Sequence, residues 1–169
     1  MLRHAWTRRL NCPRTSSVGR LFDAAAALLG LVSQASYEGQ APSSLESACT
    51  EAAEPISLPL RRRDDGIWEG DWGPLLELLQ DAGQSASFRA ATFHATLAEL
   101  LLAQARAVRA ERGVCRIGLG GGVFQNRVLC ERVMSRAEQE GFSVHMPEQL
   151  PCNDAALSFG QIIEAGACS

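Results

Sequence analysis

The chain has 169 residues, 46% of them hydrophobic and 21% charged, which is enough apolar material for one domain-sized core. Its net charge is only −3, so the sequence predicts no binding to nucleic acid, whose phosphates attract strongly basic surfaces. All 16 basic residues are arginine, and this lack of lysine excludes Schiff-base chemistry and a P-loop with its phosphate-binding lysine. Because the sequence shows neither a bilayer-spanning apolar run nor a secretory signal, we expect a cytoplasmic protein without a membrane partner.

The cysteines and histidines are too dispersed to form a local metal motif. The six cysteines, at positions 12, 49, 115, 130, 152 and 168, include no C-x-x-C pair, and the three histidines form no H-x-x-x-H pair. We expect most of the cysteines to be small, buried apolar residues. A metal site in this chain would be incomplete or assembled from distant positions.

Hydrophobic periodicity predicts two helices in the first third of the chain. Residues 16–30 combine serine N-caps, apolar residues at helical spacing and a closing glycine. Ser43 and Glu46 have the spacing of a capping box, which predicts a short helix that Pro55 ends.

The segment 55–73 is rich in proline, glycine and charge, which predicts a surface connection, with Ile56–Leu60 able to form a short edge strand. We interpret Arg61–Arg63 as a solvated face rather than an anion site. Two helices follow, one from Pro74 to Gly83 and the longest from about Ser87 to Gly113. His94 lies beside the apolar stripe of the longer helix, so we interpret it as a hydrogen-bonded structural histidine.

Residues 114–146 have the pattern of a βαβ unit. Strands are predicted over 114–119 and 142–146, with three glycines at 120–122 and a helix over 126–140 between them. A unit of this size predicts two parallel strands, a right-handed crossover and α/β architecture. The three glycines should therefore lie at the carboxyl edge of the first strand.

The glycine-rich turn allows two interpretations. Glycines before a helix let a backbone approach a phosphate, and the helix start offers N–H donors. The same glycines also suit a tight strand-to-helix turn without any ligand. The segment lacks the third glycine of a dinucleotide-binding G-x-G-x-x-G motif, so a Rossmann NAD site is a poor fit. Asn126 fits a helix cap with a ligand role beside it.

The last motif is PCNDAALSFGQ, at residues 151–161. Asn153 and Asp154 precede a predicted helix whose buried face would hold Ala156, Phe159 and Ile163. One polar residue is enough for a cap. If Asn153 caps the helix, the Asp154 carboxylate is left for a cation or a substrate hydroxyl.

Four motifs together resemble the C-terminal end of the HypF-type hydrogenase maturation carbamoyltransferases, in order and spacing, from Asn11 to Ala165. They are TSSVGRLFDAAAALLGL at 15–31, SYEGQA at 36–41, GLGGGVFQNRVLCERV at 118–133 and PCNDAALSFGQ at 151–161. The resemblance implies an α/β fold, a partial lobe of the actin, sugar-kinase and heat-shock-chaperone superfamily with a parallel βαβ unit and flanking helices. The whole chain, 1–169, would be a C-terminal fragment: 11–60 the edge of the first lobe with nucleotide-contact helices, 61–73 a connection and 74–169 the second lobe.

The activity that this resemblance implies is transfer of a carbamoyl group from carbamoyl adenylate, which such proteins make from carbamoyl phosphate and ATP. The acceptor would be the C-terminal Cys of the partner HypE, on the route to the cyanide ligands of nickel–iron hydrogenase. A divalent metal would polarise the carbamoyl or phosphate oxygens. The alternative is a truncated, inactive module that keeps an adenine-nucleotide or interaction surface.

The resemblance also assigns roles to particular residues. By analogy with the related tRNA threonylcarbamoyl-transferases, Asp23 and Gly39 would contact the ribose and nucleotide, with Glu38 a weaker candidate. The residues implied to line the phosphate and nucleotide are Gly121, Gly122 and Asn126, and the implied metal ligand is Asp154.

This sequence departs from the family pattern in three ways. Gly120 replaces the usual serine, and Ala155 and Ala156 replace the usual glycine pair. The H-x-x-x-H metal pair and the adenylating module have no counterpart in this sequence. We therefore expect an incomplete metal site in this chain and no activity from the chain alone.

Overall fold

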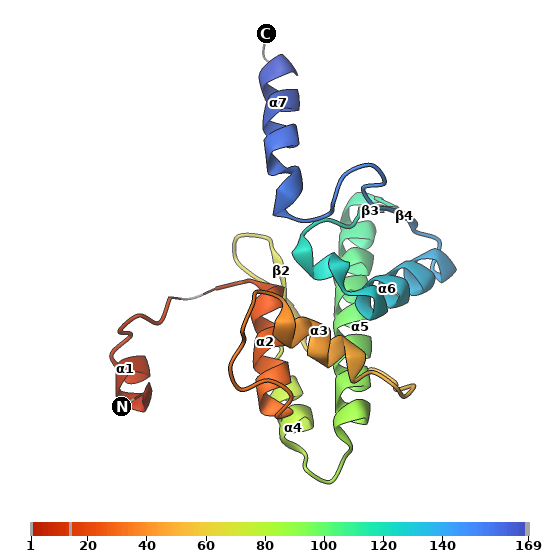
Figure 1. The fold of residues 1–169 in the computed structure, drawn as a ribbon. Helices are drawn as coiled ribbons and strands as arrows, with labels where there is room; N and C mark the ends of the chain where they lie inside the picture. The colour runs from red at the N-terminus through yellow and green to blue at the C-terminus, as the bar shows by residue number, and fades with distance from the viewer. Residues whose placement is uncertain (1, 14, 168–169) are drawn as a thin grey trace.

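The computed structural model describes residues 2–13 and 15–167, which form helices packed about one long helix, with two small two-stranded sheets beside it (Figure 1). In chain order, its elements are α1 (Leu2–Thr7), α2 (Val18–Leu28), α3 (Gln40–Ser47), β1 (Leu60–Arg62), β2 (Trp68–Gly70), α4 (Pro74–Gln80), α5 (Ala86–Arg112), β3 (Arg116–Gly118), η1 (Gly122–Gln125), α6 (Arg127–Gln139), β4 (Ser143–His145), η2 (Asp154–Ala156) and α7 (Leu157–Ala167). No helix among the described residues is both long and apolar enough to cross a membrane.

Helix α5 is the central element, with α2, α3 and α4 on one side and α6 on the other (Figure 1). The helix begins where the Ser85 Oγ accepts a hydrogen bond from the Phe88 N–H at 2.9 Å, and it ends at Gly113 in the left-handed conformation. The predicted limits of this helix are therefore confirmed. Its buried side contributes Phe93, whose ring meets that of Phe22 of α2 edge-on at 5.0 Å.

The βαβ unit has the predicted topology. Strands β3 and β4 pair in parallel, with Ile117 opposite Val144, and α6 runs between them. Each strand has only three residues, so the sheet is shorter than the sequence pattern predicted. Figure 1 shows the glycine turn leaving the carboxyl end of β3, the edge that the sequence predicted for it.

Ion pairs join α6 to the central helix. Glu99 of α5 pairs with Arg106 of the same helix and, at 2.7 Å, with Arg136 of α6. Arg106 also pairs with Glu140, at the end of α6, at 3.0 Å. Because the members are only partly exposed and share partners, this network restrains α6 against α5 more firmly than isolated surface pairs would.

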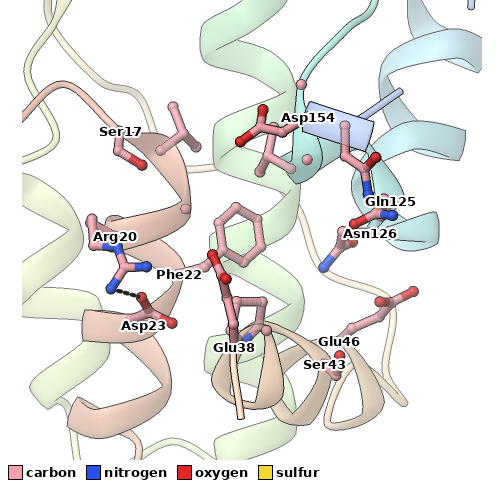
Figure 2. Close-up of a pocket in the computed structure, with 18 of the residues that line it drawn as sticks. Ser17, Arg20, Phe22, Asp23, Glu38, Ser43, Glu46, Gln125, Asn126 and Asp154 are labelled. Carbon is pink, nitrogen blue, oxygen red and sulfur yellow. Dashed lines mark ion pairs between the residues drawn. The ribbon is translucent and has the colours of Figure 1, made fainter. Parts of the chain in front are cut away.

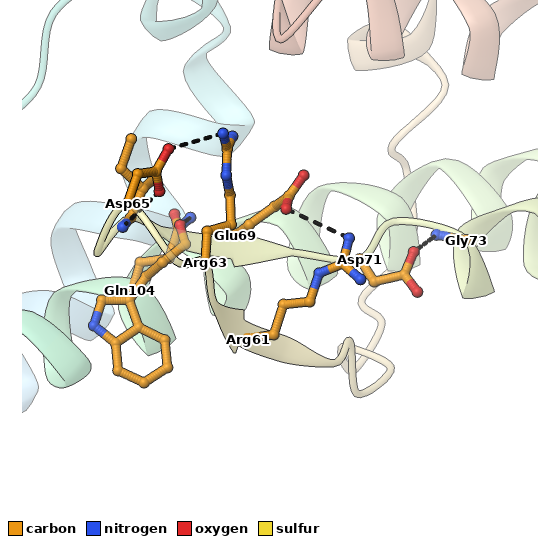
Figure 3. A network of polar contacts seen from close by, with 9 residues as sticks. Arg61, Arg63, Asp65, Glu69, Asp71, Gly73 and Gln104 are labelled. Atoms are coloured by element: carbon orange, nitrogen blue, oxygen red, sulfur yellow. Dashed lines mark hydrogen bonds and ion pairs between the residues drawn. The ribbon is translucent and has the colours of Figure 1, made fainter.

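A β-hairpin lies in the segment that the sequence assigned to a surface connection. Strands β1 and β2 pair antiparallel, and the Gln104 Nε2 of α5 donates to the Trp68 carbonyl at 3.0 Å (Figure 3). Gly70 permits this close approach, since a Cβ there would overlap the Leu100 side chain of α5 unless that side chain moved. The strand expected at Ile56–Leu60 begins only at Leu60, because the Ile56 N–H instead donates to the Thr96 Oγ1 of α5 at 3.0 Å.

The arginines of this hairpin lie on its solvent side, as predicted. Arg61 pairs with Glu69 at 3.4 Å and Arg63 with Asp65 at 2.8 Å (Figure 3). Arg62 pairs with Glu111 of α5 at 3.5 Å. All three arginine side chains are more than half exposed.

The predicted capping box at Ser43 and Glu46 is wrong. Helix α3 begins three residues earlier, after Gly39, whose φ of 88° ends the preceding turn. Ser43 therefore lies inside the helix, and the Glu46 carboxylate accepts a hydrogen bond from the distant Arg127 N–H at 2.9 Å. The helix also ends at Ser47, well before Pro55.

The predicted buried face of the last helix is also wrong. No described residue of α7 is buried, and Phe159 and Ile163 are 47% and 57% exposed. Figure 1 shows α7 projecting from the body of the fold. Periodicity identified an apolar face, but no other described element covers it. The cysteines differ from expectation as well: Cys130 is buried, whereas Cys12 and Cys115 are exposed, and Cys168 lies outside the described residues.

Candidate functional site

A cavity of about 760 Å³ opens where four separate segments of the chain meet (Figure 2). Its walls come from the start of α2, the turn before α3, the glycine turn after β3 and the loop that enters η2. These segments are far apart in the sequence, and the packing of α2, α3 and α6 around α5 brings them together. The volume lies within the range of small-molecule sites.

Every residue that the sequence singled out as a ligand candidate lines this cavity. These residues are Asp23, Glu38, Gly39, Gly121, Gly122, Asn126 and Asp154. The sequence analysis therefore selected residues that the fold brings to one place, whereas their individual roles stay predictions.

The glycine turn presents backbone rather than side chains to the cavity. Gly121 has a φ of 102°, which L side chains rarely adopt, and its N–H donates to the Cys152 carbonyl at 2.6 Å. This bond ties the turn to the loop that carries Asp154. Among the described residues, none accepts a hydrogen bond from the N–H of Gly122 or of Val123. Two neighbouring N–H donors on a cavity wall suit a phosphate or another anion.

Asn126 joins the cavity to the core. Its Oδ1 accepts a hydrogen bond from the Leu129 N–H at 2.9 Å, so it caps α6 as the sequence predicted. Its Nδ2 lies 3.0 Å from the Nε2 of His94, which is completely buried in α5. His94 is therefore a buried, hydrogen-bonded histidine rather than a residue of the cavity wall, in agreement with the sequence analysis.

Carboxylates dominate the charge of the cavity. Asp23 pairs with Arg20, one turn earlier on α2, at 3.1 Å (Figure 2). Glu46 is held by the Arg127 N–H. Glu38 and Asp154 have no ion-pair partner among the described residues. Arginine is the only cationic residue type on these walls, so a phosphate here would depend mainly on backbone N–H donors.

The donor set does not complete a metal site. The described residues contain no group of three or more His, Cys, Asp or Glu side chains that could hold a metal ion together. Asp154 supplies one carboxylate, whereas a catalytic divalent ion usually has about three protein ligands. The role of Asp154 as a metal ligand therefore stays a prediction.

Cys49 and His94 are close together, but they are not arranged as a nucleophile and its base. The Cys49 Sγ lies 3.1 Å from the His94 Nδ1, and that nitrogen also lies 2.8 Å from the Ala90 carbonyl. A carbonyl can only accept, so Nδ1 carries a proton and cannot take one from the thiol. Burial also raises the pKa of the Cys49 thiol to about 11, which disfavours the reactive thiolate.

Several cavity residues escaped the sequence analysis, among them one arginine, one phenylalanine and one glutamate. Arg20 lies three positions before Asp23, a spacing that pairs side chains on one face of a helix and could have revealed it. Phe22 lines the cavity from a position that periodicity assigned to the core. Glu46 was assigned to a cap, and its contact with Arg127 spans 81 residues, which no local pattern encodes.

Comparison with known proteins gives one consistent family. The family model described as "Carbamoyltransferase, Kae1-like Domain, second subdomain" matches residues 1–161. The carbamoyltransferase HypF of Synechocystis sp. is 35% identical over 167 residues, which cover 96% of this chain and 21% of the relative. A HypF homolog of Cupriavidus necator is 36% identical, with 91% of this chain and 41% of the relative covered.

Solved structures agree with the sequence relatives. A crystal structure of full-length HypF in its phosphate- and nucleotide-bound form superposes with a TM-score of 0.90 at 33% identity. The match covers 98% of this chain and 22% of that chain, so this chain spans about a fifth of the full-length protein. The shared fold and the family match lead to one conclusion: the chain belongs to the carbamoyltransferase family of HypF, as the second subdomain of its Kae1-like domain.

Proposed function

We propose that this chain forms the nucleotide-holding part of a HypF-type carbamoyltransferase, which transfers a carbamoyl group from carbamoyl adenylate to the C-terminal Cys of HypE. The observation that supports the proposal most is the convergence of all the selected residues on one cavity. That a similar full-length HypF was solved with phosphate and nucleotide bound supports a nucleotide as the occupant, and we propose an adenine nucleotide.

In this proposal different walls of the cavity bind different parts of the nucleotide. The N–H groups of Gly122 and Val123 hold the adenylate phosphate, and the left-handed turn at Gly121 directs them toward it. The Asp23 carboxylate accepts from the ribose hydroxyls. Gly39 leaves space beside them, since a Cβ at this position would have no atom within 4 Å.

The chemical step follows from these contacts. The acceptor thiol loses its proton to solvent, and the sulfur attacks the carbamoyl carbon. The bond from that carbon to the adenylate phosphate oxygen breaks, so AMP leaves and a thiocarboxamide remains. Negative charge grows on the departing phosphate, where fixed N–H donors stabilise it most effectively. We propose that Asp154 contributes one ligand to a divalent metal whose other ligands lie outside this chain.

A chimeric protein tests this function. Residues of this chain replace the matching C-terminal part of the Synechocystis HypF, and formation of HypE thiocarboxamide from ATP and carbamoyl phosphate is followed by mass spectrometry. We expect the chimera to form the product and its Asp154→Ala variant to lose at least 90% of the rate. Exposed Glu164→Gln, on α7 and outside the cavity, is the matched control.

One observation favours a second candidate function. Because the described residues hold no set of three metal-ligating side chains, the chain also suits a nucleotide-binding module without turnover. A chimera that folds and binds nucleotide but forms no thiocarboxamide would select this second function and reject the first.

A further inference from the structure

We infer that His94 is a positioning residue, which fixes the amide of Asn126 so that it presents an N–H donor to a nucleotide in the cavity. The inference rests on the proposed function, which places a nucleotide in the cavity that Asn126 lines. His94 is completely buried in α5 and is not part of the cavity wall, so it acts only through its neighbour. Asn126 is 6% exposed and lines the wall.

The hydrogen bonds allow one arrangement of protons. The His94 Nδ1 lies 2.8 Å from the Ala90 carbonyl oxygen, so Nδ1 carries the proton and donates it. In the neutral ring Nε2 is then an acceptor, and the Asn126 Nδ2, 3.0 Å away, is its donor. At the other end of the amide, Oδ1 accepts from the Leu129 N–H. Each end of the Asn126 amide therefore has its own partner.

The hydrogen bonds to His94 and Leu129 together determine which part of the Asn126 amide is available to a ligand in the cavity. With only the Leu129 bond, the amide could turn about its Oδ1 contact, whereas the bond to His94 removes that freedom. One N–H of Nδ2 is used by His94, which leaves the second N–H for an acceptor such as a phosphate or ribose oxygen. A donor that is already oriented loses less entropy when the ligand binds.

The surroundings keep the imidazole in place and neutral. The ring of His94 meets those of Phe22 and Phe93 edge-on, at 5.3 and 5.8 Å between centroids. Burial lowers the pKa of His94, and the charged and titratable groups around it are Glu46 and Cys49 from the α3 side and Arg132 from α6. A second proton on the ring would place N–H against N–H at Asn126. The amide would then lose either His94 or its capping bond to Leu129.

Calorimetry with AMP on the full chain tests the inference through three variants. His94→Leu removes the acceptor and should weaken AMP binding about tenfold, the cost of a lost buried hydrogen bond. His94→Gln retains an acceptor and a donor and should restore most of the affinity. Thr92→Val is the matched control, because Thr92 is buried in the same helix and its hydroxyl has no hydrogen-bond partner among the described residues. It should bind AMP like the wild type.

A pH series provides the readout that a purely structural role would not change. Because burial lowers the pKa of His94 from the usual 6.5, AMP affinity should fall more steeply in the wild type than in His94→Gln only below pH 6.5, while phosphate protonation affects both proteins equally. A steeper wild-type fall that begins above pH 6.5 would overturn the inference. So would wild-type affinity in a His94→Leu protein whose circular dichroism shows a native helix content.

Nitrogen-15 NMR of the imidazole separates this inference from the proposed function. We expect a neutral ring protonated at Nδ1, with a slowly exchanging Asn126 side-chain N–H that becomes fast in His94→Leu and stays slow in His94→Gln. The opposite tautomer would refute the positioning role whatever AMP does. The expected tautomer in a wild type that fails to bind AMP would instead refute the nucleotide role and, with it, the purpose assigned to His94.

Discussion

One partly buried thiol, that of Cys49, makes the stability of the fold depend on pH. The Cys49 thiol is partly buried between α3 and α5, where its Sγ contacts the Leu45 carbonyl at 3.4 Å and the His94 ring. Burial raises its pKa from 9.0 to about 11, with Arg132 opposing the shift and Glu46 adding to it. A group that holds its proton more tightly when folded stabilises the fold only while it is protonated.

The sign of the Cys49 effect follows from this linkage. Below pH 9 both states carry the proton and the contribution is fully present, whereas between pH 9 and about 11 the unfolded chain loses its proton first. The free energy of unfolding should therefore fall in this range, by an amount on the order of 1 kcal/mol after partial exposure is allowed for. Urea unfolding of Cys49→Ser should show a shallower alkaline loss. Cys115→Ser, at an exposed site, should keep the wild-type curve, and equal curves for both variants would contradict the assignment.

At the scale of elements, the glycine turn between β3 and α6 carries the proposed phosphate contact. Gly121→Val should abolish nucleotide binding with little loss of helix content, because the φ of 102° is unfavourable for a branched side chain and the turn must change conformation. The helices on either side keep their own caps and packing. Gly118→Ala is the control, since its added Cβ has no atom within 4 Å and its φ is not positive. Calorimetry that finds equal affinity in Gly121→Val and the wild type would rule out a role of this turn.

The elements also show which parts of the fold the sequence could predict. The limits of α5 and α6 follow from local chemistry, because Ser85, Asn126 and Gly113 suit the cap positions they occupy. The start of α3 and the hairpin were mispredicted, because they depend on contacts from far along the chain, such as Glu46 with Arg127 and Trp68 with Gln104. Local patterns contain no information about such partners.

The same distinction between local patterns and distant contacts explains which residues of the candidate site the sequence could predict. The glycine turn and Asp154 were found because their residue types suit phosphate and cation chemistry. Their convergence with Asp23 came from a family resemblance rather than from any local spacing, since α2 and η2 lie at opposite ends of the chain. The link from His94 to Asn126 joins residues 32 positions apart and needed the structure.

At the scale of the whole molecule, α7 contributes little to the stability of the described fold. Ile162 and Ile163 are 70% and 57% exposed, so replacing both with serine should leave the unfolding temperature within about 2 °C of the wild type. Leu129→Ala is the buried comparison, at 0% exposure on α6, and it should cost about 2–5 kcal/mol. Differential scanning calorimetry would measure both. A large loss in the α7 variant would show that its apolar face is covered in solution, for example by a second copy of the chain.

The extent of the whole chain also bears on which reaction we expect it to catalyse alone. It corresponds to 21% of the Synechocystis relative, and Asp154 is the carboxylate that we assign to the metal, with no group of three metal-ligating side chains among the described residues. A single carboxylate holds a divalent ion weakly in water, because the ion keeps most of its hydration. We therefore expect the isolated chain to bind adenine nucleotide without transferring a carbamoyl group.

Synthetic carbamoyl adenylate provides the direct test of this limit, because it bypasses the adenylating step. The purified chain is mixed with it, with added divalent metal and with a peptide carrying the HypE C-terminal Cys, and mass spectrometry follows the thiocarboxamide. We expect the same slow rate with the wild type, with Asp154→Ala and without protein, since uncatalysed attack by the thiol is common to all three. A rate that rises with the wild type and falls to background in Asp154→Ala would contradict this expectation. It would mean that a second copy of the chain, or residues interpreted here as structural, completes the site around Asp154.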